Sequence, residues 1–197
     1  DSENTNCDDV IHNRLKKCGF CVKELQPIGL DYLYANISED SIEYERCNCN
    51  KSKEYWKEID NKEYASAVSK LFIIDFYTLS NKTSINDVGS VQFVYSSYKS
   101  DFVDYAREGI YKQVKSNLDN DRSQDLPEVK SVTINSIEEI VPSTELKSDD
   151  FKNVTDPEAY KVKISWDYTK SNDFQTSATM VIVKDGEKLS VAKLEDE

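Results

Sequence analysis

The apolar positions of residues 62–79 recur every three or four residues, the spacing that places side chains on one face of an α-helix. Two further aromatic residues, Phe72 and Phe76, widen this face into a broad stripe. A helix with so wide an apolar stripe is expected to pack against a surface as wide as a β-sheet. The regular positions of the stripe are Tyr64, Ala67, Val68, Leu71, Ile74 and Tyr77.

Two more helices and a short strand are predicted from the same kind of pattern. Ser100 is a suitable N-cap for a helix over residues 101–117, in which Gly109 would permit a close contact. Nearer the N-terminus, the pattern predicts a strand over residues 30–37 and a helix that begins at Ser38. The predicted inner face of the helix over residues 101–117 consists of Phe102, Tyr105, Ala106, Ile110 and Val114.

The chain after Pro127 has the two-residue period of β-strands. Residues 128–141 form one candidate strand, whose alternation breaks at Asn135 and indicates a bend or bulge. Further strands are predicted over residues 159–169, 174–184 and 188–194, the last two joined by the hairpin signal Asp185-Gly186. Strands joined by such short turns are antiparallel neighbours. In residues 159–169 the side chains of Tyr160, Val162, Ile164, Trp166 and Tyr168 are expected to share one face.

Together these elements predict an α+β fold, in which helices are followed by a curved antiparallel β-meander. This is the chain order of the nuclear-transport-factor-2-like, or cystatin-like, cone, where a curved sheet wraps a long helix. We expect the cone-like domain to span residues 38–197 and a separate cysteine-containing segment to span residues 1–37.

Two stretches of the chain carry a resemblance to known proteins. Residues 70–82, KLFIIDFYTLSNK, and residues 87–94, DVGSVQFV, resemble a group of uncharacterised exported or membrane-anchored proteins of low-GC Gram-positive bacteria. The resemblance covers about residues 38–194. It implies the cone-like fold and an extracellular or cell-surface location, and it brings no catalytic residues with it.

The charge of the chain argues against two classes of partner. The formal net charge is −12, and no basic cluster is longer than Lys16-Lys17. Nucleic acids and anionic membrane surfaces are bound largely through lysine and arginine, so neither is expected as a partner. No apolar run approaches the roughly 18 residues of a spanning helix. Because the chain opens on a polar stretch without a methionine, we expect a processing site or boundary there, which leaves room for an upstream membrane anchor.

All five cysteines lie in the first quarter of the chain, a clustering that suggests a local staple. Structural disulfides among them would each constrain the unfolded chain by ~3 kcal/mol and leave one thiol over. A tetrahedral zinc site is the alternative for Cys18, Cys21, Cys47 and Cys49, and a redox role or free thiols are the third possibility. Beyond that zinc alternative we predict no cofactor. The disulfide candidates are Cys7, Cys18, Cys21, Cys47 and Cys49.

No catalytic constellation is recognisable, which favours a non-enzymatic role. His12 is the only histidine, and no glycine-rich phosphate loop is present. Asp75 stands out because it interrupts the most apolar helix, where carboxylates are seldom buried unless they are paired. One hypothesis gives Asp75 a structural bond to a loop amide or a tyrosine hydroxyl. The other places it in a ligand pocket of the cone, together with Tyr77, Trp166 and Tyr168.

These observations lead to one function hypothesis and one alternative. The first is an extracytoplasmic protein-interaction or assembly module of the bacterial cell envelope, which binds envelope proteins or self-associates through the open face of its sheet. The alternative is a small-molecule-binding or enzymatic cone with its pocket near Asp75.

Overall fold

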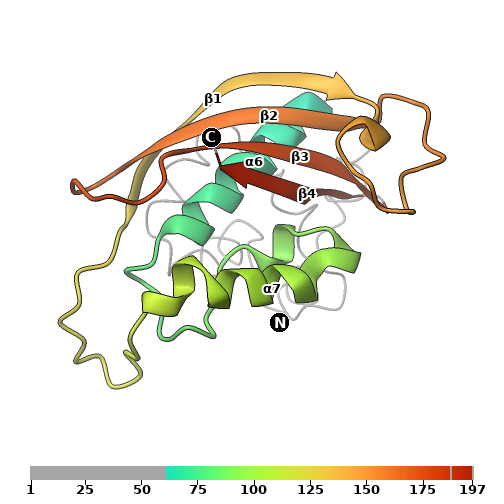
Figure 1. Ribbon diagram of the computed structural model, residues 1–197. Helices are drawn as coiled ribbons and strands as arrows, with labels where there is room; N and C mark the ends of the chain where they lie inside the picture. The colour runs from blue at the N-terminus through green and yellow to red at the C-terminus, as the bar shows by residue number, and fades with distance from the viewer. Residues whose placement is uncertain (1–60, 187, 197) are drawn as a thin grey trace, which may run out of the picture.

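The computed structural model describes residues 61–186 and 188–196, which form an α+β arrangement of helices and one sheet (Figure 1). Predictions that fall in residues 1–60, among them the strand over residues 30–37, the helix from Ser38 and every cysteine, lie outside these residues. The longer elements are α6 (Asn61–Tyr77), α7 (Lys99–Glu108), β1 (Val129–Ile140), β2 (Ala159–Tyr168), β3 (Ser177–Asp185) and β4 (Lys188–Asp196). The short 3-10 helices are η1 (Val91–Phe93), η2 (Ser96–Tyr98), η3 (Ile110–Gln113) and η4 (Pro142–Thr144).

The four strands follow one another in the order β1-β2-β3-β4, each antiparallel to the next, and for β2, β3 and β4 this is what the short turns predict. The sheet is not closed, so β1 and β4 are its edges. Figure 1 shows α6 lying across one face of the sheet and α7 lying on the far side of α6. The rings of Phe72 and Phe76 on α6 contact Phe102 on α7, with centroids 5.6 and 5.2 Å apart.

Helix α6 confirms the predicted helix, but its burial is more complete than a single stripe. Every residue from Leu71 to Tyr77 is buried, including the polar Asp75. The sheet covers one side of this helix, while α7 and the loop after α6 cover the other. When a helix is enclosed on all sides, any polar side chain on it needs hydrogen-bond partners from the protein itself, because water does not reach it.

Strand β1 contains the irregularity predicted at Asn135. The pairing register with β2 shifts between Ile134 and Ser136, so Asn135 is an extra residue. Ile134 then pairs with Ile164 and Ile137 pairs with Val162, and both isoleucines contact the core. Residues three apart share a face of a strand only when a bulge intervenes, so the bulge keeps both in the core.

The meander confirms the predicted alternation and the final hairpin. Tyr160, Val162, Ile164 and Trp166 are buried on the α6 side of the sheet, and Tyr168 packs at their edge. Asp185 pairs with Lys188, and Gly186 adopts φ 65°, the left-handed conformation that such a turn demands. Strand β3 begins at Ser177 rather than at residue 174, because Asn172 Oδ1 accepts a hydrogen bond from the Phe174 amide and prolongs the turn.

The prediction for the second helix was wrong at its C-terminal end. Helix α7 stops at Glu108, where the amide of Gly109 donates to the carbonyls of Tyr105 and Ala106, and the chain turns into η3. After this turn Tyr111, absent from the predicted inner face, is completely buried. Tyr105, predicted to face inward, is 54% exposed. The shorter helix presents this tyrosine to solvent, because the core beneath α7 is filled by Phe102 and Ala106.

Candidate functional site

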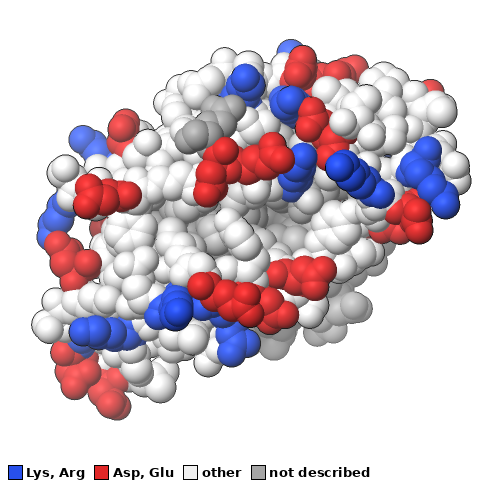
Figure 2. Space-filling view, viewed as in Figure 1, with Lys and Arg blue, Asp and Glu red and all other residues white. Residues whose placement is uncertain are grey.

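An open groove of about 240 Å³ lies between α7 and the edge strand β4. Tyr98, Phe102 and Tyr105 form the wall on the α7 side, and residues 191–194 form the wall on the β4 side. Phe72 and Val94 close the bottom. Figure 2 shows it as the hollow in the middle of this face of the molecule. The groove is thus apolar and aromatic at its base and open to solvent along its length.

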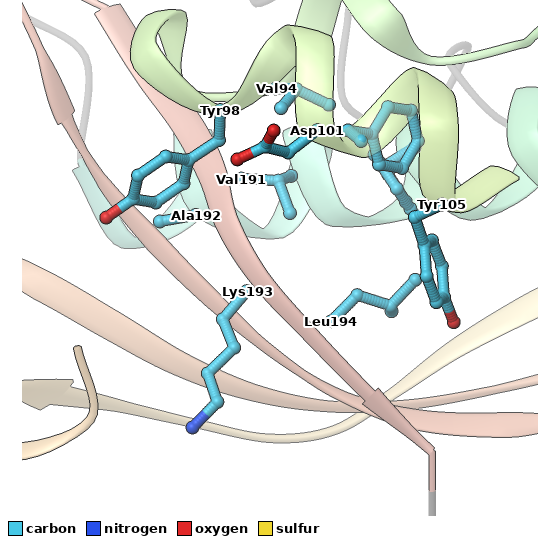
Figure 3. A pocket seen from close by; sticks show the side chains of 10 residues that line it. Val94, Tyr98, Asp101, Tyr105, Val191, Ala192, Lys193 and Leu194 are labelled. Carbon is cyan, nitrogen blue, oxygen red and sulfur yellow. The ribbon is translucent and has the colours of Figure 1, made fainter. Parts of the chain in front are cut away.

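The groove contains one free acidic side chain. Asp101, in the first turn of α7, lines it, and Figure 3 shows the carboxylate lying between Tyr98 and Val191. Asp101 makes no ion pair with any residue in the described part of the chain. The ammonium of Lys193 lies elsewhere: it donates to the Glu145 carbonyl oxygen (3.2 Å) and pairs with Glu195 (2.8 Å). Figure 3 shows it directed away from Asp101.

More negative charge surrounds this carboxylate. Asp101, Asp104, Tyr105 and Glu108 follow the i, i+3, i+4, i+7 spacing of one helix face, and all four are exposed. Burial and then the charge of Asp196, the last residue of β4, raise the pKa of the Tyr105 hydroxyl. In Figure 2, acidic side chains stand on both rims of the hollow.

The β4 wall also offers backbone hydrogen-bonding groups. On its outer side, β4 has a single bridge, between Val191 and Val94, reinforced by the Tyr95 amide donating to the Val191 carbonyl (2.8 Å). Beyond Val191, within the described ranges, the outer edge of β4 has no backbone partner. The register with β3 shifts at Ala192, so β4 has a bulge at this residue. A bulge bends the strand and interrupts the regular row of backbone groups along its edge. The backbone groups of this edge that have no partner within the described residues are of the kind that can hydrogen-bond to a further extended segment.

Asp75, the leading sequence-predicted ligand residue, lines neither this groove nor the second hollow described below. Its carboxylate is 4% exposed, and its Oδ1 accepts a hydrogen bond from Lys82 Nζ at 3.1 Å. Its Oδ2 accepts one from the Ser90 amide at 2.9 Å. The contact with Ser90 matches the structural hypothesis of a bond to a loop amide. The chemistry available to Asp75 is thus the chemistry of a buried, paired carboxylate.

Lys82 completes this buried pair. It is 0% exposed, and its ammonium also donates to the Thr78 carbonyl (2.8 Å) and to Asn81 Oδ1 (2.7 Å). Each of the three N–H groups of the ammonium thus has an acceptor, as a buried ammonium requires. Lys82 was not predicted from the sequence, although its position within the stretch over residues 70–82 was a signal, since a buried carboxylate needs a cation nearby.

The loop that contacts Asp75 is held to α6 by neighbouring residues. A Cβ atom at Gly89 would lie 2.3 Å from the backbone oxygen of Asp75, so only glycine fits there. The Gly89 amide donates to the Tyr111 hydroxyl (3.0 Å), which in turn donates to the Phe76 carbonyl (2.7 Å). The stretches over residues 70–82 and 87–94 thus meet in one buried polar cluster, formed by Asp75, Lys82, Gly89, Ser90 and Tyr111.

The other predicted ligand residues form an aromatic cluster on the opposite side of α6. The rings of Tyr77 and Trp166 are 4.5 Å apart. The Tyr77 hydroxyl donates to Gln175 Oε1 (3.1 Å) and the Tyr168 hydroxyl to the Gln175 carbonyl (2.6 Å). Burial raises the pKa of Tyr168 to about 12, partly offset by the nearby Trp166 side chain. The structure therefore groups Tyr77, Trp166 and Tyr168 and separates them from Asp75.

A second hollow, of about 150 Å³, lies between the 125–128 connection and the 169–174 turn. Its lining is more polar, and its Lys170 and Asp125 side chains pair with each other at 3.3 Å. Within residues 61–186 and 188–196, no three histidine, cysteine or acidic side chains are grouped to hold a metal ion. No helix in the same ranges is long and apolar enough to cross a membrane. The zinc and disulfide alternatives for the cysteines fall outside them.

Comparison with protein-family models, curated proteins and solved structures finds no significant match for this chain. The resemblance of residues 70–82 and 87–94 to exported Gram-positive proteins therefore stays a prediction. What the fold and the groove define is a class: an α+β domain with an open antiparallel sheet and an acidic, aromatic groove beside an edge strand.

Proposed function

We propose that this chain is a non-enzymatic protein-interaction module of the bacterial cell envelope, exposed outside the cytoplasm, which binds an extended segment of a partner in the groove between α7 and β4. The architecture we propose for it is the nuclear-transport-factor-2-like cone, with α6 as the central helix. The observation that carries the proposal is the outer edge of β4, which beyond Val191 has no backbone partner among residues 61–186 and 188–196, beside an apolar, aromatic hollow. An exposed strand edge binds extended chains through backbone hydrogen bonds, and an adjacent pocket selects side chains.

The size of the groove favours a polypeptide over a free small molecule. Its volume of about 240 Å³ is below the roughly 300–1,000 Å³ typical of pockets for drug-sized ligands. It is open along its length, which suits a chain that enters at one end and leaves at the other. The alternative function near Asp75 has less support, because that carboxylate is engaged by Lys82 and the Ser90 amide.

The open face of the sheet is less suited to self-association than the groove. Its exposed positions carry polar side chains that bond to one another, as in the pair Ser131–Asp167. At one end of this face, Leu146 and Phe151 from the β1–β2 connection already cover Val181 and Val183. Little apolar surface is left there for a second copy, so we assign partner binding to the groove.

The proposal is tested by selecting short random peptides, displayed on phage, for binding to the full chain. Tyr105→Ala removes one wall of the groove at a site that is 54% exposed and so tolerates truncation. Leu118→Ala is the matched control, because Leu118 is also exposed, at 72%, and lies outside the groove. We expect the enriched peptides to bind the Leu118→Ala chain normally and the Tyr105→Ala chain at least ~10-fold more weakly. Failure to enrich any peptide sensitive to Tyr105→Ala would refute the proposed function.

A further inference from the structure

We infer that the partner segment bound in the groove is basic: an extended stretch of another protein that directs a lysine or arginine at Asp101 and places apolar side chains on either side of it. This inference rests on the proposed function and specifies the chemistry of the partner. Three features support it: the charge of the groove, the edge of β4 that is unpaired within the described residues, and the apolar base.

The first feature that favours a basic segment is the negative charge of the groove. Asp101 stands inside an otherwise apolar hollow without an ion-pair partner in the described residues. Asp104 and Glu108 extend the negative face along α7, and Asp196 adds charge from the β4 side. Among the described residues that line the groove, Lys193 is the only cation, and its ammonium is occupied by Glu145 and Glu195. A cationic side chain is therefore the group that would gain most from entering, because complementary charge governs both specificity and association rate.

The second feature is the position of the Asp101 carboxylate beside the edge strand β4. The bridge between Val94 and Val191 shows that the outer side of β4 accepts an extended neighbour, and residues 191–194 of this strand line the same groove as Asp101. A segment that continues this pairing brings alternate side chains toward the groove. One of these can approach Asp101, while the next on the same face contacts Tyr105 or Leu194 on the walls.

The apolar base selects the neighbours of the cation. Phe72 and Val94 are buried in the core at the bottom of the groove, and Leu194 packs against the same core from β4. Apolar side chains on the partner would bury their surface there, at about 25 cal/mol per Å² removed from water. Aromatic walls also attract a lysine or arginine, whose charge is favourable over a ring face. A partner with aliphatic residues around one basic residue satisfies all of these features.

The test measures binding of the tightest Tyr105-sensitive peptide from the selection, together with a counterpart in which each lysine or arginine is replaced by glutamate. We use the full chain, Asp101→Asn, Asp101→Lys and, as the matched control, Asp173→Asn, an exposed carboxylate in the β2–β3 turn. We expect Asp101→Asn to weaken the basic peptide ~10-fold and Asp173→Asn to change it less than ~2-fold. The Asp101→Lys chain should not bind the basic peptide and should bind the counterpart in which glutamate replaces each lysine or arginine.

Salt dependence provides a readout that a general loss of structure would not reproduce. Raising NaCl from roughly 0.05 to 0.5 M should weaken binding to the unchanged chain more than binding to Asp101→Asn, because the variant lacks one of the charge pairs that salt screens. Since Asp101 also stabilises the first turn of α7, thermal unfolding of each variant is measured alongside.

The outcomes separate the inference from the proposed function. Tyr105-sensitive peptides without a basic residue, or affinity indifferent to Asp101→Asn, would overturn the inference and leave the proposed function standing. If no Tyr105-sensitive peptide emerges, both fall together. A carbodiimide cross-link between Asp101 and Lys16 or Lys17 of the same chain would also overturn it, because the groove would then hold this chain's own segment.

Discussion

The buried pair Asp75–Lys82 makes a strong prediction about stability. Replacing Lys82 by methionine keeps the length of the side chain but removes the ammonium, which has 0% exposure and three hydrogen-bond acceptors within 3.1 Å. Asp75 then keeps the Ser90 amide at 2.9 Å, but its charge loses the buried cation. Removing one partner of a buried ion pair costs about 3–5 kcal/mol, because an uncompensated charge stays behind. That is a large part of the ~5–15 kcal/mol that stabilises a typical domain.

The assay is equilibrium unfolding in guanidinium chloride, followed by far-ultraviolet circular dichroism. In a thermal melt of the same variants, a loss of 3–5 kcal/mol in a chain of this size corresponds to a melting temperature lower by about 6–20 °C. Lys170→Met is the matched control, since Lys170 pairs with Asp125 at 3.3 Å while both side chains are more than 70% exposed, at 73% and 74%. An exposed pair contributes at most ~1 kcal/mol to stability, so the Lys170→Met variant should unfold at nearly the same denaturant concentration as the unchanged protein.

A double-mutant cycle identifies the cause of the loss. Asp75→Asn leaves the ammonium of Lys82 without its carboxylate, and the double variant Asp75→Asn with Lys82→Met removes both charges. The double variant should therefore be less destabilised than the sum of the two single variants, by at least ~1 kcal/mol. If Lys82→Met costs no more than Lys170→Met, or if the two changes are additive, the pair does not hold α6 to its loop as we reason.

Three further predictions concern the same cluster and the outer face of the sheet. Gly89→Ala places a Cβ atom 2.3 Å from the Asp75 backbone oxygen and should cost about 2–3 kcal/mol in the same unfolding assay; a loss under ~0.5 kcal/mol would contradict the packing. Tyr111→Phe leaves the Gly89 amide and an α6 carbonyl unsatisfied, and should cost ~2 kcal/mol without changing the fold seen by circular dichroism. The hydrogen bond from Lys161 lowers the pKa of Glu145 below its ordinary 4.5, so this pair stabilises the fold above that pH and the contribution is lost as the pH falls below it. Glu145→Gln should therefore flatten the acid side of the curve of melting temperature against pH, and an unchanged curve would count against the pair.

Local sequence pattern determined the elements of this fold. The apolar spacing in residues 62–79 predicted α6 within two residues at either end, because helical periodicity is a property of the chain itself. The break at Asn135 and the turn residues Asp185-Gly186 likewise placed the bulge and the hairpin. These features depend on backbone conformations that a few adjacent residues favour, so they can be predicted without knowing what packs against them.

Tertiary structure decided which residues face solvent and which polar groups meet. The sequence left Asp75 with two roles, and only the approach of Lys82 and the loop at Ser90 shows which bonds it makes. The groove was not predicted at all, because its walls come from α7 and from β4, about 90 residues later in the chain. No local pattern records that Asp101 and Tyr105 lie opposite the edge strand β4. Periodicity specifies a residue's face within its own element, whereas the neighbour of that face is set by how the elements pack.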